Sequence, residues 1–203
     1  MIKLGSAKKS KCLPWLLAGM LVLAALHFSS TTYRRQIAFL LDDKNPKLLA
    51  ASAVNDMKTI RQLLAEGAEV NGYDSNLWHP LHFAAHENYR DQIELLLASG
   101  ADINARTNYQ WTPLHWAVYQ NRYEATEMLL RHRANSNIAN YQGNTPLHLC
   151  AFNNNPKIAT LLLRYGADIN RKNFSGSTPL DYAVHQNALA VTEFLLNAKA
   201  DPS

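Results

Sequence analysis

A repeat of 33 residues is the feature that most limits what this chain of 203 residues can fold into. Three separate series share that interval and one register. They are Pro80, Pro113, Pro146 and Pro179; Asn55, Asn88, Asn121, Asn154 and Asn187; and Ala68, Ala101, Ala134, Ala167 and Ala200. Fixed-period similarity of this kind indicates stacked structural repeats. We therefore expect about five of them from residue 44 onward.

Each repeat is expected to form two helices. Thr112 suits a helix N-cap, and Pro113 suits the first helical position, where a missing N–H does no harm. The first helix should end near Asn121, because asparagine tolerates a left-handed exit, and the second should run through Met128–Leu130. One such unit cannot bury its apolar faces alone, so the repeats must stack to make a core.

The motifs T-P-L-H, A-A-x-x-N and L-L-L-x-x-G-A-D-I-N resemble those of the ankyrin-repeat family. The resemblance implies an all-α ankyrin-repeat solenoid of helix-turn-helix units with β-hairpin fingers. It covers residues 44–203, divided into a cap repeat 44–73 and repeats 74–106, 107–139, 140–172 and 173–203. It also implies that the histidines His82, His115 and His148 form hydrogen bonds between repeats.

Some positions depart from the family pattern. The turn glycine of the fingers is present as Gly143 and Gly176 but is replaced by Leu77 and Gln110 in the earlier repeats. Those two fingers should be strained or differently shaped. Arg133 replaces the glycine at the exit of a second helix, as does Lys199, and each should weaken its helix end by roughly 1 kcal/mol if a left-handed residue is required there.

The N-terminus predicts a membrane-directing segment. A basic flank, residues 1–11, precedes residues 12–28, which carry no charged side chain and are expected to form a single hydrophobic helix; residues 29–43 would link it to the repeats. We favour an uncleaved anchor, with the basic flank in the cytoplasm and the repeats across the membrane. Signal cleavage, giving a secreted or periplasmic protein, is the alternative, and a buried helix of a soluble protein is a third.

The charge distribution argues against nucleic acid as a partner. Six of the 20 basic residues precede the first acidic residue, Asp42, which leaves 14 basic against 16 acidic residues in the remainder. The repeats therefore lack the basic field that phosphate binding needs. Of the two cysteines, Cys12 belongs to the apolar segment and Cys150 to the repeats, so no disulfide within the repeats is expected.

Ankyrin repeats usually bind partners through their finger tips and the inner face of their first helices. The resemblance places ten candidate contact residues there: Trp78, His86, Glu87, Tyr109, Trp111, Tyr119, Tyr141, Phe152, Phe174 and His185. Aromatic residues predominate, which favours a protein or peptide ligand over a small molecule. Trp78 and Trp111 have packing between fingers as an alternative role. For Phe83, Trp116, Leu149 and Tyr182 we expect core packing.

No credible active site or cofactor site emerges. His79, His82 and His86 lie close enough to suggest zinc, but the family role of His82 is structural and no regularly spaced further ligand is present. Cys150 replaces a packed alanine, which argues against a nucleophile. We therefore expect a non-enzymatic, membrane-tethered or exported binding protein. The alternatives are an accessory or inhibitory subunit of an extracytoplasmic enzyme and, more remotely, a zinc-dependent sensor or enzyme.

Overall fold

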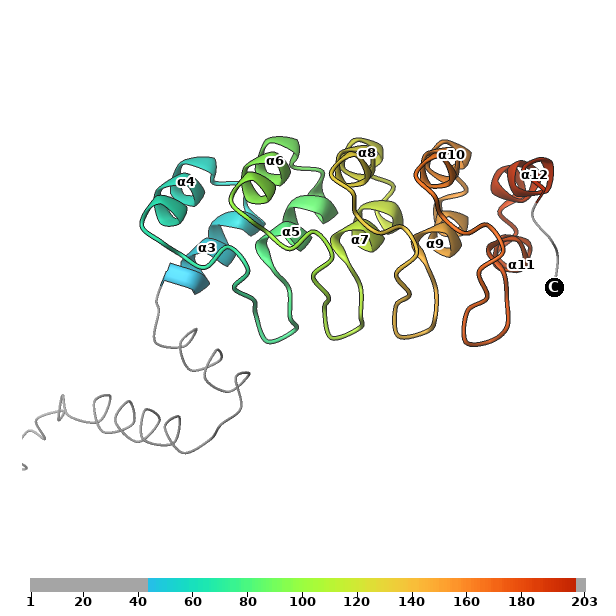
Figure 1. The fold of residues 1–203 in the computed structure, drawn as a ribbon, viewed down its shortest axis with the longest axis horizontal. Helices are drawn as coiled ribbons and strands as arrows, with labels where there is room; N and C mark the ends of the chain where they lie inside the picture. Colours follow the sequence, from blue (N-terminus) through green and yellow to red (C-terminus); the bar gives the residue numbers. More distant parts are fainter. Residues whose placement is uncertain (1–43, 200–203) are drawn as a thin grey trace, which may run out of the picture. The chain divides into compact units, whose positions relative to one another are not determined.

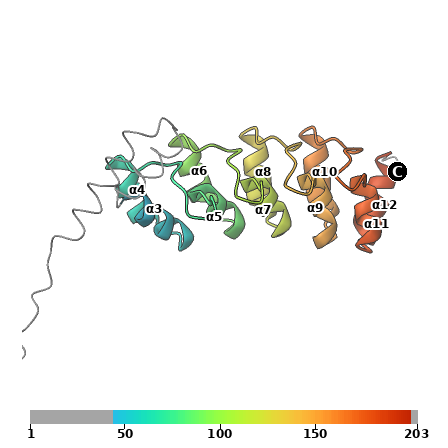
Figure 2. The same cartoon turned by 90° about the horizontal axis from the view of Figure 1, so that it is seen from below.

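A computed structural model describes residues 44–199, and these residues form five pairs of helices. The pairs are α3 (Lys44–Ala53) with α4 (Met57–Ala65), α5 (Pro80–Glu87) with α6 (Arg90–Ala98), α7 (Pro113–Tyr119) with α8 (Tyr123–Arg131), α9 (Pro146–Asn153) with α10 (Pro156–Arg164), and α11 (Pro179–His185) with α12 (Leu189–Asn197). In Figures 1 and 2 the pairs follow one another in a row, with the first helices in one layer and the second helices in another. The expected helical repeats are therefore present.

The first helix of each central repeat begins as the sequence predicts. Thr112 Oγ1 accepts a hydrogen bond from the His115 N–H, while His115 Nδ1 accepts one from the Thr112 N–H at 3.2 Å. Pro113 occupies the first helical position. In α5, where His79 replaces the threonine, its backbone N–H still donates to His82 Nδ1 at 3.1 Å. The histidine therefore preserves this part of the cap where the threonine is missing.

The same histidines connect each repeat to the next. Nε2 of His82 lies 3.1 Å from the Trp111 carbonyl oxygen, Nε2 of His115 lies 3.2 Å from that of Asn144, and Nε2 of His148 lies 3.1 Å from that of Ser177. Since Nδ1 accepts from a backbone N–H, the proton must sit on Nε2, which donates. These bonds confirm the structural role that the resemblance implied. The fifth repeat, which has no following repeat in the described part, carries Asp181 at this position.

Burial strongly favours the neutral form of these imidazoles. Desolvation lowers the pKa of His82 to about 3 and that of His115 to about 4, and it also lowers the pKa of His148. A neutral ring can accept at Nδ1 and donate at Nε2 at once, whereas a protonated ring could only donate. The cap bond accepted by Nδ1 therefore depends on the absence of the second proton, whereas the inter-repeat bond donated by Nε2 does not.

Left-handed residues end the helices where the sequence predicts. Asn121 has a φ of 57° at the exit of the α7 region, and Arg133 has a φ of 66° after α8, where other repeats have glycine. A Cβ built on Gly100 or Gly166, which occupy that exit in other repeats, meets no atom within 4 Å. The cost at Arg133 is therefore conformational rather than steric, about 1 kcal/mol relative to glycine.

The fingers differ from the expected β-hairpins. Within residues 44–199 no strand forms, and the fingers are tight loops, such as that closed by the 2.9 Å bond from the Thr107 N–H to the Trp111 carbonyl. The closing residues are only four apart, so there is no length for a ladder. Neighbouring fingers are joined by single backbone–backbone bonds, for example from the Tyr141 N–H to the Tyr109 carbonyl at 3.1 Å.

The residues and backbone angles at the finger turns confirm that the early and late fingers differ. Leu77 and Gln110 adopt φ values of 57° and 59°, so two non-glycine residues hold the left-handed turn. Gly143 has a second reason to be glycine, because a Cβ there would lie 2.5 Å from the Phe174 backbone nitrogen. The finger of Gly143 and the following one therefore approach more closely than a side chain would allow.

The core lies between the two helical layers and between successive repeats. Ala84 and Ala117 of the first helices are fully buried, as are Leu96 and Leu129 of the second helices. Small residues let the first helices approach, while the leucines fill the layer between repeats. Of the four residues expected in the core, Leu149 is buried, whereas Phe83, Trp116 and Tyr182 are only half-buried and reach the surface described below.

The segments that carry the membrane prediction, residues 1–11, 12–28 and 29–43, lie outside the described residues. Within residues 44–199, no helix has the length and apolar character needed to cross a membrane.

Candidate protein-binding groove

Two rows of aromatic rings run along the repeats on the side of the fingers and first helices. The tip row consists of Tyr109, Tyr141 and Phe174, which are 61%, 53% and 78% exposed. The helix row consists of Tyr119, Phe152 and Tyr182, from α7, α9 and α11. Five of these six were predicted as contact residues; Tyr182 was assigned to the core. We call the surface that carries both rows the aromatic groove.

The rings of the helix row contact one another, as do Tyr109 and Tyr141 of the tip row. In the tip row the centroids of Tyr109 and Tyr141 are 5.6 Å apart. In the helix row Phe152 lies 5.3 Å from Tyr119 and 5.8 Å from Tyr182, with edge-to-face geometry in both pairs. Such pairs are preferred because the positive edge of one ring meets the negative face of another. The repeats thus hold these exposed rings in fixed mutual positions.

A third group, the tryptophan cluster, lies at the N-terminal end of the aromatic groove. The centroid of Trp116 is 4.6 Å from that of Trp78 and 4.5 Å from that of Trp111, and all three side chains are half-buried. Trp111 also contacts Tyr119 of the helix row at 5.2 Å. Trp78 and Trp111 thus both pack on Trp116 of α7 rather than directly on each other. It does not exclude contact with a ligand, since part of each ring remains exposed.

His86 and Glu87 form a polar pair beside the tryptophan cluster. His86 Nδ1 lies 2.7 Å from Glu87 Oε1, and its Nε2 lies 2.6 Å from Gln120 Nε2. Arg122 donates from Nε to the His86 carbonyl at 3.0 Å and lies 3.8 Å from the Glu87 carboxylate. These two predicted residues are thus oriented by the next repeat.

His185 is the predicted contact residue that the structure does not bring to the others. It is exposed at the end of α11 and makes no ring contact or hydrogen bond within residues 44–199. Its place in the repeat matches that of Phe152, but no later repeat in the described part contributes a neighbouring ring.

A hollow of about 290 Å³ opens between the last two fingers. It is lined by Tyr141, Gln142, Asn144, Asn173, Phe174, Ser175 and Tyr182. Its polar floor is ordered, because Asn173 Nδ2 donates to Asn144 Oδ1 at 2.8 Å. Burial raises the pKa of the Tyr182 hydroxyl, which therefore stays protonated at neutral pH. Aromatic walls and amide groups together can accept an apolar side chain and hydrogen-bond the backbone next to it.

The three histidines considered for zinc are engaged in hydrogen bonds. His79 Nδ1 lies 2.9 Å from the Asn71 carbonyl oxygen, and both nitrogens of His82 contact backbone groups. His86 contacts Glu87 and Gln120 instead. Across the part of the chain that the structure describes, no three His, Cys, Asp or Glu side chains are grouped to hold a metal ion.

Cys150 is buried in α9, and burial raises the pKa of its thiol. A thiol held neutral is a poor nucleophile. The nearby His148 cannot act as its base, because both ring nitrogens already bond to the Thr145 cap and the Ser177 carbonyl. The structure places Cys150 as a packing residue.

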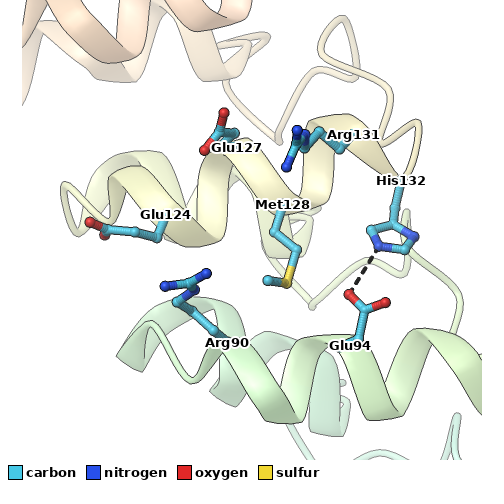
Figure 3. A pocket seen from close by; sticks show the side chains of 7 residues that line it. All are labelled: Arg90, Glu94, Glu124, Glu127, Met128, Arg131 and His132. Carbon is cyan, nitrogen blue, oxygen red and sulfur yellow. Dashed lines mark hydrogen bonds and ion pairs between the residues drawn. The ribbon is translucent and has the colours of Figure 1, made fainter.

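A second hollow, of about 260 Å³, lies on the other layer of helices, between α6 and α8. Figure 3 shows Met128 at its centre, with Arg90 and Glu94 on one side and Glu124, Glu127, Arg131 and His132 on the other. His132 Nε2 lies 3.2 Å from Glu94 Oε2. Sequence reasoning missed this hollow, because its charges meet only when two second helices from successive repeats are packed. Their signs are mixed, which gives no preference for one class of ligand.

The comparison with protein families matches the arrangement of helices and fingers. A family model described as ankyrin repeats in three copies matches residues 7–107, 47–140, 106–173 and 135–203. A search of curated proteins found no match. The repeats of this family indicate a protein–protein interaction module and are typically non-enzymatic. With the matched residues covering most of its length, this chain belongs to the ankyrin-repeat family.

Proposed function

We propose that this chain binds an extended segment of a protein along the aromatic groove. The observation that carries the proposal is the pair of aromatic rows, in which three neighbouring pairs of rings stand 5.3–5.8 Å apart. In an extended peptide, alternate side chains on one face are roughly 7 Å apart, which is close to this spacing. An aromatic surface of this kind suits apolar side chains of a peptide better than a charged ligand.

The polar groups of the groove support the same kind of ligand. Gln142 is exposed beside Phe174 and Tyr141, where the peptide backbone would need donors and acceptors, while the Asn144 and Asn173 amides below it are bonded to each other. Glu87 is the one carboxylate among the ten predicted contact residues, and it is paired with His86. The ligand should therefore be apolar along its length and carry few charges.

Alanine substitution of the tip row tests the groove. We expect the combined change Tyr109→Ala, Tyr141→Ala and Phe174→Ala to weaken affinity for a copurified protein partner by about 2 kcal/mol or more, because aromatic anchors dominate binding energy. The stability of the fold should change little, since all three side chains are mostly exposed. Titration calorimetry measures the first effect and thermal unfolding the second.

Tyr123→Ala is the matched control, because Tyr123 is a 36% exposed tyrosine on α8, in the other helical layer. It should leave affinity unchanged. If the control weakens binding as much as the triple variant, the groove assignment is wrong. Loss of activity of one copurified enzyme on binding would favour the inhibitory-subunit alternative over a general binding role.

We also propose that residues 12–28 tether the chain to a membrane, with the repeats on the side opposite the cytoplasm. The uncharged apolar composition of that segment and the four lysines before it support this arrangement. The intact chain should then stay with membranes after a high-salt wash, and added protease should digest it only from the non-cytoplasmic side. A soluble product beginning near residues 23–31 would retain export but reject the anchor.

A further inference from the structure

The fingers that border the hollow beside Tyr141 have already used their backbone N–H groups. In residues 140–144, Asn140 accepts from the last three N–H groups of the finger, through Oδ1 and its carbonyl oxygen, at 2.9–3.0 Å. Its own N–H donates to the Asn144 carbonyl at 2.9 Å, and the Tyr141 N–H donates to the Tyr109 carbonyl at 3.1 Å. This finger therefore has no backbone donor left for a ligand.

The next finger, residues 173–177, uses its backbone N–H groups in the same way. Asn173 accepts from the last three N–H groups of this finger, at 3.0 Å each. Its own N–H donates to the Ser177 carbonyl at 2.9 Å, and the Phe174 N–H donates to the Gln142 carbonyl at 3.1 Å. A peptide that binds as an added β-strand needs both N–H donors and carbonyl acceptors from a free edge. These two fingers therefore cannot pair with a ligand strand.

The donors that remain in this part of the aromatic groove belong to side chains. Asn144 Nδ2 donates to Gln142 Oε1 at 3.3 Å, whereas Nε2 of the exposed Gln142 has no partner among the described residues. The hydroxyls of Tyr109 and Tyr141 also have no partner within residues 44–199, and each can donate to a carbonyl oxygen. A ligand rich in proline has carbonyl groups but few N–H groups. It therefore supplies the acceptors that these side chains need and leaves few donors of its own unsatisfied.

Charge and spacing also agree with a ligand of this kind. No residue of either finger is charged, and neither is any ring of the tip row or the helix row. Prolines are uncharged, so they lose no ionic hydration at this surface. In a polyproline II helix one turn of three residues rises about 9 Å. Since packed helices lie roughly 8–10 Å apart, each turn of such a ligand meets one repeat.

We propose that the segment bound in the aromatic groove is rich in proline and lies there as a polyproline II helix. This inference rests on the proposed function, because it names the kind of peptide that the same groove takes. The prolines stack on the rings of the tip row and the helix row, and the carbonyl groups between them accept from Gln142 and the tyrosine hydroxyls. An α-helical ligand would leave those donors without acceptors, because its own carbonyls are bonded internally.

Binding of a dye-labelled peptide of nine prolines to the purified full chain, followed by fluorescence anisotropy, tests the proposal. Such a peptide is about 28 Å long and reaches across about three repeats. We expect saturable binding, and binding weaker by about 10-fold or more for an alternating valine–serine peptide of the same length, which favours the β conformation. Gln142→Glu should weaken binding of the nine-proline peptide about 10-fold, because a carboxylate keeps the acceptor for Asn144 but has no donor for the ligand. Circular dichroism should show an unchanged fold, since Gln142 is exposed.

Gln62→Glu makes the same change of charge on α4, in the other helical layer, and is the matched control; it should leave the affinity unchanged. Equal or tighter binding of the valine–serine peptide, or of an alanine-rich helical peptide, would overturn the proposal, as would a Gln142→Glu variant that binds like the parent. If the nine-proline peptide does not bind, whereas the tip-row variant still loses affinity for the copurified partner, the proline assignment is wrong and the proposed function stands. If the peptide does not bind and the tip-row variant keeps full affinity for that partner, both are wrong.

Discussion

At pH 5 we expect the free energy of unfolding to be about 4 kcal/mol lower than at pH 7.5, because His82 and His115 stay neutral in the folded chain. In the unfolded chain an exposed histidine gains a proton as the pH falls through about 6.5. In the folded chain, burial lowers the pKa of His82 to about 3 and that of His115 to about 4. Between these values the unfolded state binds more protons, so stability falls as the pH falls.

The size of this loss in unfolding free energy follows from the pH interval between the unfolded-state and folded-state pKa values. Each histidine contributes about 1.4 kcal/mol per pH unit below its unfolded pKa, or about 2 kcal/mol at pH 5. His148, whose pKa burial also lowers, adds to the loss. Hydrogen bonds from Thr59 lower the pKa of the Asp56 carboxyl. This carboxyl therefore takes up a proton only at a more acidic pH and does not add to the histidine effect. Denaturant unfolding followed by circular dichroism at each pH measures the slope.

His115→Gln separates the titration from the packing. It removes one titrating group, so the slope between pH 6 and pH 5 should decrease by about 1.4 kcal/mol per pH unit, although the variant is less stable at neutral pH. His185→Gln, which changes an exposed histidine outside the inter-repeat bonds, should leave the slope as it is. An unfolding free energy that does not change between pH 7 and pH 5 would contradict the neutral hydrogen-bonding role of these rings.

The helical frame was predictable because its causes are local. Thr112, Pro113 and Asn121 each act through a backbone conformation or a cap within a few residues, so their spacing alone places the helix ends. The left-handed turn at Gln110 was also predictable, because the two later fingers have glycine there, Gly143 and Gly176. Such features need only the repeat period and the preferences of single residues.

Exposure could not be predicted in the same way, because it depends on what the neighbouring repeat contributes. Trp116 and Tyr182 share one repeat position with the buried Leu149, yet both reach the groove. Val184 shares its position with the buried Val118 but is 60% exposed, since no helix pair of residues 44–199 lies over it. The charged hollow around Met128 likewise arises between side chains of α6 and those of the α8 repeat, which lie 30 or more residues apart in sequence. These features follow from stacking rather than from local pattern.

Trp116→Ala should lower the free energy of unfolding by about 3 kcal/mol or more, the range for truncating a packed aromatic side chain. Its ring lies 4.6 Å from Trp78, 4.5 Å from Trp111 and 5.5 Å from His86, so truncation removes the centre of the tryptophan cluster. Tyr141→Ala, in the exposed tip row, is the control and should cost less than about 1 kcal/mol. Thermal or denaturant unfolding measures both.

Trp116→Phe should cost much less than Trp116→Ala, which identifies ring packing as the cause. The Trp116 Nε1–H is buried and has no hydrogen-bond partner among the described residues, so removing it loses no bond and relieves an unsatisfied donor. Phenylalanine keeps an aromatic ring between Trp78 and Trp111, and we expect a cost below about 1.5 kcal/mol. If the two variants are equally unstable, an unseen partner of Nε1 stabilises the cluster. If both are as stable as the parent, the cluster does not support the fold, and Trp78 and Trp111 are held only to meet a ligand.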